Sequence, residues 1–212
     1  MKTDDLIASL VADHPSRMQP VWLWLLAGLF AALPLSAAIF MMSFRMRPDL
    51  ASAIYNPFFD FKFVVMLVLA SVSAALSLHL SRPGASLERW GWLLAVPAGL
   101  LGIAIVADFA VPQRNSWTAR LVGSSAMACM ASIPLFAVPF LAAALWTLRR
   151  GATTRPMLVG ALAGLMSAGL GGAIYAVHCM DDSPLFVATW YTLAAVLVAI
   201  VGAFVGRRVL RF

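Results

Sequence analysis

Six long apolar runs dominate the pattern of hydrophobic and polar positions along this chain. Each run is close to the roughly 20 residues with which a helix crosses about 30 Å of hydrocarbon. Because lipid offers no hydrogen-bond partner to the backbone, a helix is the structure that such a run adopts in a membrane. The pattern therefore predicts an all-α, polytopic integral membrane protein with six transmembrane helices. We expect these helices at residues 21–44, 59–80, 90–111, 122–148, 156–178 and 184–206.

Composition supports the same class. The chain has 212 residues, of which 62% are hydrophobic and 11% charged, whereas soluble domains have roughly 25% charged residues. A formal net charge of +6 would suggest nucleic acid as a partner for a soluble protein. Here the arginines flank apolar runs, so we interpret them as topology and headgroup anchors. The expected partner is the lipid bilayer, with no direct nucleic-acid contact. Prolines at positions 34, 97, 134 and 139 fall inside runs, and we expect them to kink helices.

Basic residues predict the orientation. If both termini are cytoplasmic, ten basic residues lie inside and five outside, which agrees with the positive-inside rule. The inner set is Lys2, Arg17, Arg82, Arg89, Arg149, Arg150, Arg155, Arg207, Arg208 and Arg211; the outer set is Arg45, Arg47, Lys62, Arg114 and Arg120. We expect no cleaved signal peptide, because the first twenty residues carry three aspartates where a signal peptide is basic.

The polar segment at residues 1–20 contains a short amphipathic pattern. Thr3 can cap a helix whose first turn holds Asp4 and Asp5. The apolar face of that helix consists of Leu6, Ile7, Leu10 and Val11. Its acidic face opposes binding to an anionic leaflet. Two interpretations remain equally open: a helix that docks into a protein groove, and a solvated tail.

The only two cysteines are Cys129 and Cys179, and both would lie on the oxidising, outer side of the membrane. They are either small buried hydrophobes or a redox or metal-responsive pair. His178 could lower the pKa of its neighbour Cys179. A soft-metal site that includes Asp181 is weakly signalled, since CxxC and HxxxH patterns are absent. We therefore assign no metal and no cofactor.

Other classes have less support. Asp60, Lys62 and Asp108 lie near the outer helix ends, where snorkelling to water is cheap, and no ladder of ionisable groups crosses the bilayer centre. A small transporter is therefore disfavoured. The sequence also lacks nucleotide-binding and hydrolase motifs, so we expect no enzyme. A thiol oxidoreductase is the enzyme alternative, although such a relay generally uses CxxC or two cysteine pairs.

The fifth run contains a GxxxG pattern at Gly160 and Gly164, followed by Gly169, Gly171 and Gly172. Small residues allow helix backbones to approach closely in lipid. Packing within the chain is the favoured interpretation, and a homodimer remains possible.

Four stretches of the chain form a recognisable set: MKTDDLIASLVAD at the start, RPDL at 47–50, RRG at 149–151 and HCMDDSPLFVATWY at 178–191. Together they resemble the NrsF family of six-helix inner-membrane anti-sigma factors. The resemblance implies that Cys129 and Cys179 are signal-sensing cysteines. It also implies that the segment from Met1 to about Asp13 holds an extracytoplasmic-function (ECF) sigma factor. Oxidants or thiol-reactive metals are the inducers that the family implies.

These inferences combine into one hypothesis. Residues 1–20 form a cytoplasmic sigma-docking segment, residues 21–206 a six-helix transmembrane domain, and residues 207–212 a cytoplasmic basic tail. The protein sequesters its sigma factor at a bacterial inner membrane. Oxidation of Cys129 and Cys179 to a disulfide, or a metal that bridges them, releases it.

Overall fold

The computed structural model describes residues 3, 5, 7, 20–111 and 116–211. Within these residues the chain is helical and without strands, and it has six helical spans long and apolar enough to cross a membrane. The predicted all-α polytopic fold is therefore confirmed. The spans are α2 (Val21–Ser43), α4 (Pro57–Leu80), the 3₁₀ turn η1 (Gly91–Leu94) with α5 (Ala95–Ala110), α6 (Trp117–Val122) with α7 (Ala126–Leu148), α8 (Pro156–Ala176), and α9 (Pro184–Phe186) with the π-helical turn η2 (Val187–Tyr191) and α10 (Thr192–Val209).

Local sequence explains where several helices begin. Proline occupies the first turn of α4, α8 and α9, where its missing N–H costs no helical hydrogen bond. Asn56 caps α4, since its side-chain oxygen accepts a hydrogen bond from the N–H of Phe58 at 3.1 Å. The short helix α3 (Leu50–Ala53) lies in the connection between α2 and α4.

The main differences from the prediction concern the fourth span, one proline and the end of the last helix. The fourth run is divided at Gly123, whose φ of 61° favours glycine, so α7 starts only at Ala126. Pro97 lies in the first turn of α5 rather than in a helix middle, unlike the prolines at 34, 134 and 139. The last helix continues through Arg207 and Arg208 to Val209, so the predicted basic tail begins inside α10.

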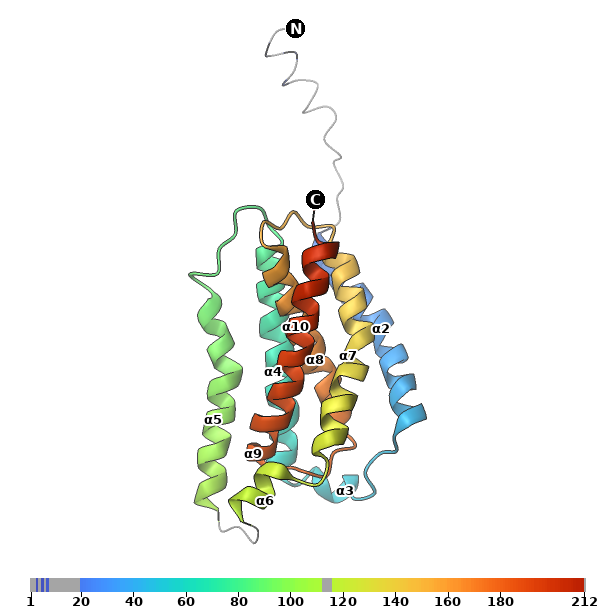
Figure 1. Cartoon of the computed structure of the whole chain (residues 1–212), viewed down its shortest axis with the longest axis vertical. Helices are drawn as coiled ribbons and strands as arrows, with labels where there is room; N and C mark the ends of the chain where they lie inside the picture. The colour runs from blue at the N-terminus through green and yellow to red at the C-terminus, as the bar shows by residue number, and fades with distance from the viewer. Residues whose placement is uncertain (1–2, 4, 6, 8–19, 112–115, 212) are drawn as a thin grey trace.

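Helix α8 is the centre of the bundle. It packs against α4, α7 and α10, while α2 covers α7 and α5 stands at the edge against α4 (Figure 1). Glycines make this arrangement possible. A Cβ atom on Gly160 would collide with the backbone of Gly202 in α10, and one on Gly169 would lie 2.6 Å from the carbonyl oxygen of Met66 in α4. A Cβ on Gly171 would lie 2.9 Å from the backbone of Ala137 in α7. The GxxxG contact is thus made within the chain, as the sequence indicated.

The bundle has two different ends (Figure 1). We call the end with the start of α2, the C-terminus and the connections 81–90 and 149–155 the terminal end. Arginines gather there, and two of them lie over indole rings: Arg149 over Trp146 at 3.6 Å, and Arg150 over Trp24 at 3.9 Å. We call the opposite end, with α3, α6 and α9, the loop end.

Candidate functional site: an ion-pair cluster around Cys179

At the loop end, residues 177–183 join α8 to α9, and we call this segment the thiol loop. Helix α8 closes with turn hydrogen bonds from the N–H groups of His178 and Cys179 to the carbonyl of Tyr175, at 2.9 and 3.1 Å. The chain then runs extended until Pro184 begins α9. This irregular backbone leaves carbonyl groups that the neighbouring segments must satisfy.

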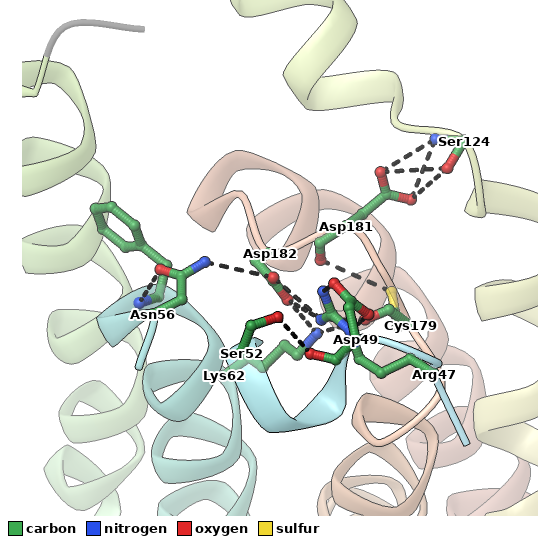
Figure 2. Close-up of polar contacts among 10 residues, drawn as sticks. Arg47, Asp49, Ser52, Asn56, Lys62, Ser124, Cys179, Asp181 and Asp182 are labelled. Atoms are coloured by element: carbon green, nitrogen blue, oxygen red, sulfur yellow. Dashed lines mark hydrogen bonds and ion pairs between the residues drawn. The ribbon is translucent and has the colours of Figure 1, made fainter. Parts of the chain in front are cut away.

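Two cations satisfy the carbonyl of Cys179. Lys62 of α4 is 0% exposed, and its Nζ donates to that carbonyl at 2.8 Å and to Oδ1 of Asp182 at 2.6 Å. Arg47 donates from Nη1 to the same carbonyl at 3.3 Å and to Asp182 Oδ1 at 3.0 Å. Figure 2 shows both side chains converging on the thiol loop from the segment before α4 and from α4 itself. One carboxylate therefore serves two buried cations.

A second carboxylate completes the charge balance. Asp49 accepts two parallel hydrogen bonds from Arg47, at 2.7 Å from Nε and 2.8 Å from Nη2. This pairing raises the pKa of Arg47 and lowers that of Asp49. Asn56, the cap of α4, donates to Asp182 Oδ2 at 3.4 Å. We call Arg47, Asp49, Lys62 and Asp182 the ion-pair cluster. Its two negative charges balance the two buried cations, Arg47 and Lys62.

Asp181 ties the thiol loop to a different helix. Its carboxylate accepts a hydrogen bond from the backbone N–H of Ser124 at 3.1 Å (Figure 2). It accepts a second one from the backbone N–H of Ser125 at 2.9 Å. Ser125 precedes α7 and makes no side-chain cap of its own. A carboxylate from the thiol loop therefore caps the amino terminus of α7, where the helix dipole favours negative charge.

Both cysteines lie beneath this arrangement. Cys129, in the first turn of α7, and Cys179 are 0% exposed, and both are free thiols packed in one apolar cluster with Tyr175 and Tyr191. The Cys179 thiol donates to the carbonyl of Asp181 at 3.7 Å. Burial raises the pKa of Cys179, and the nearby charge of Lys62 opposes that rise. The thiol is therefore protonated at neutral pH.

Comparison with known proteins identifies the family. A family model described as "Negative regulator of sigma F" matches residues 10–212, which is nearly the whole chain. The chain belongs to the NrsF family. Its relatives include the "Anti-sigma-F factor NrsF" of Caulobacter vibrioides, which is 35% identical, and the "Probable anti-sigma-F factor NrsF" of Azospira oryzae, which is 32% identical. Both alignments cover 100% of this chain and of the relative. No solved structure matches the chain.

The structure brings together only part of the site that was predicted for this NrsF-family chain. Cys129 and Cys179 share one cluster, but His178 is directed elsewhere: its Nδ1 lies 2.7 Å from the carbonyl oxygen of Arg45, and its ring lies tilted against that of Phe44. The cation that acts on the Cys179 thiol is Lys62 instead. No group of three or more His, Cys, Asp or Glu residues among those described is arranged to hold a metal ion.

The predicted sigma-docking segment lies largely outside the described residues. Asp4, Leu6, Leu10 and Val11 are not among them. Thr3, Asp5 and Ile7 are described, and all three are helical and exposed. The docking role of this segment therefore stays a prediction.

Sequence reasoning missed the ion-pair cluster. Lys62 was expected to snorkel toward water, but it is fully buried and paired with Asp182. Asp108 was treated in the same way, yet it is buried and pairs with Arg120. A usable signal was present, because the charges of the RPDL and DDSP stretches fall at the same end of a six-helix topology. Opposite charges that share one membrane boundary were candidates for pairing.

Proposed function

We propose that this chain is a membrane-bound anti-sigma factor. In this proposal it sequesters an ECF sigma factor at a bacterial inner membrane and releases it when Cys129 and Cys179 react. The observation that carries the proposal is its membership of the NrsF family over essentially its whole length, with two relatives whose names describe anti-sigma factors. A regulatory role also fits the family better than a catalytic one.

The orientation proposed here has both termini in the cytoplasm. Its support is the distribution of basic residues. Among the described residues, eight arginines lie at the terminal end: Arg82, Arg89, Arg149, Arg150, Arg155, Arg207, Arg208 and Arg211. The loop end holds four basic residues, Arg45, Arg47, Lys62 and Arg120. This excess favours a cytoplasmic terminal end, because Lys and Arg are enriched on the cytoplasmic side of membrane proteins.

The sigma factor would bind at the terminal end. Residues 3–11 carry the apolar and acidic side chains for this contact, chiefly Thr3, Asp4, Asp5, Leu6, Ile7, Leu10 and Val11. An amphipathic helix that docks in a groove of its partner buries one apolar face and exposes its charges. The Arg149–Arg155 connection, which joins α7 to α8, lies at the same end and is within reach of a bound protein.

Signal transfer follows from the two helices that carry the thiols. In the oxidation step, the two thiols give two electrons and two protons to a peroxide, which becomes water, and one S–S bond forms. The new bond fixes the start of α7 to the loop after α8, and both helices run from there to the 149–155 connection. A complete switch from 99:1 to 1:99 takes about 5.5 kcal/mol of difference between the two folded states. The disulfide supplies that difference only if its geometry fits the released state better than the sequestering state.

The docking role is tested with Leu6→Asp and Leu10→Asp, each in the full chain. Sigma-dependent transcription should become constitutive, and the sigma factor should no longer co-purify with solubilised membranes. Ser9→Asp is the matched control, because the same charge is added to the opposite face of the expected helix. Unchanged repression in the two leucine variants would remove the docking role.

The sensing role is tested with Cys129→Ser and Cys179→Ser separately. Each variant should repress normally without stress and lose its response to peroxide. A normal peroxide response in either variant would eliminate the thiol pair as the sensor while leaving the anti-sigma proposal intact.

A further inference from the structure

A groove with arginines at its rim lies between α8 and α10 at the terminal end. Its apolar wall consists of Pro156, Met157, Leu158 and Ala161 of α8 and Ala203 of α10. Arg155, Arg207 and Arg211 border it, and its volume is about 470 Å³. All three arginines are exposed. The groove therefore combines three positive charges with an apolar surface.

Glycine packing explains why the groove exists. Gly160 of α8 faces Gly202 and Gly206 of α10, and a Cβ on Gly206 would lie 2.6 Å from the Cα of Gly160. The two helices thus approach with no side chains between them at this level. Ala161 and Ala203 lie beside this contact and are also small, so the space next to the contact stays open. Arg155 and Arg207 border this space.

The apolar wall belongs to membrane-spanning helices, and the arginines stand where those helices end. A ligand of this groove must therefore carry an acyl chain toward the bilayer interior and a negative charge at its surface. We propose that the groove binds one anionic phospholipid, with its phosphate between Arg155, Arg207 and Arg211 and an acyl chain along Met157, Ala161 and Ala203. Guanidinium groups suit this role because they bind phosphate in a bidentate manner.

The basic surface extends beyond this groove. A second hollow of about 690 Å³ shares Arg207 and Arg211 and adds Arg208 and Phe204, which extends the basic surface around the end of α10.

Native mass spectrometry of the full chain in detergent tests the proposal, with phosphatidylglycerol as the probe and phosphatidylcholine for comparison. The protein should bind one phosphatidylglycerol in a saturable way and phosphatidylcholine much more weakly. Arg207→Gln with Arg211→Gln should weaken phosphatidylglycerol binding about 25-fold, at about fivefold for each arginine near the surface.

A matched pair of arginines provides the control. Arg149→Gln with Arg150→Gln removes the same charge from the same end, but these two side chains lie over Trp146 and Trp24 and not in the groove. That variant should lose less than about threefold in affinity. Ala161→Leu should also weaken binding, because it fills the wall without changing any charge.

Three results would overturn the site. They are equal binding of the two lipids, equal loss in the two double variants, and complete displacement of the lipid by inorganic phosphate at the same concentration. Unchanged elution in size-exclusion chromatography establishes that each variant is folded, and the Ala161→Leu variant tests the groove independently of the arginines.

Discussion

Asp182→Asn should open the thiol loop, because Asp182 is the counter-ion of a fully buried lysine. Without it, the partners of Lys62 are the carbonyl of Cys179 and the ring of Phe59, neither of which carries a charge, whereas Arg47 keeps Asp49. Removal of one partner of a buried ion pair costs about 3–5 kcal/mol. The amide oxygen of asparagine still accepts a hydrogen bond, so we expect the lower value, about 3 kcal/mol.

Lys62→Met should cost less. Asp182 is partly accessible, with 14% of its side chain exposed, and it retains Arg47 and Asn56 as partners. The loss is then that of hydrogen bonds to charged groups, about 1.5 kcal/mol. The double variant Lys62→Met with Asp182→Asn should recover much of the loss caused by Asp182→Asn alone, because no buried cation is left without its counter-ion.

The assay is the rate at which N-ethylmaleimide labels Cys179 in a Cys129→Ala background. Since Cys179 is 0% exposed, labelling requires local opening, and its rate reports the free energy of that opening. A cost of about 3 kcal/mol corresponds to labelling about 140-fold faster for Asp182→Asn, and about 1.5 kcal/mol to about 12-fold for Lys62→Met. Asp60→Asn, the same chemical change at an exposed site on α4, should leave the rate unchanged. Labelling of Asp182→Asn within twofold of the parent would refute the role of the ion-pair cluster.

Three further predictions concern packing, backbone and pH. Gly160→Ala should destabilise the protein by about 1–3 kcal/mol or more in thermal unfolding, since the added methyl group meets the backbone of α10. Gly99→Ala is the control, and it should be neutral or stabilising because open space surrounds it. Gly123→Ala should be worse than Gly84→Ala: both have positive φ, which costs about 1–2 kcal/mol, but only the first collides with a side chain, that of Phe186. Because burial raises the pKa of Cys179, the folded chain keeps a thiol proton that the unfolded chain releases above about pH 8.5. The free energy of unfolding should therefore fall as the pH rises above that value, and Cys179→Ala should lack the share of this decrease that comes from the thiol. Identical unfolding temperatures within either glycine pair, or the same alkaline fall in both proteins, would contradict the respective argument.

Much of the fold could be predicted because transmembrane helices follow from local sequence. Apolar length predicts each span, and the backbone has no alternative to a helix in lipid. The division between α6 and α7 was harder to predict, because the break is only three residues long, Gly123, Ser124 and Ser125, and apolar residues continue beyond it on both sides. Helix packing could be predicted in part, because glycines indicate close contacts between helices. The glycines do not indicate which helix each of them meets: Gly169 faces α4, Gly171 faces α7 and Gly160 faces α10.

The candidate site was less predictable, since it depends on residues far apart in sequence. The two cysteines attract attention by their chemistry alone. The burial of Lys62 depends on where the thiol loop folds, and the direction of His178 depends on the chain near Arg45. Pairing between segments separated by more than a hundred residues leaves no local periodicity to detect.

That separation has a consequence for biosynthesis. Arg47 meets Asp49 two residues later, so it has a counter-ion almost as soon as it leaves the ribosome. Lys62 is made 120 residues before Asp182. At roughly 5–20 residues per second, the lysine waits on the order of 10 s for its partner. Every nascent or truncated chain that ends before residue 182 therefore lacks the carboxylate with which Lys62 pairs in the complete fold.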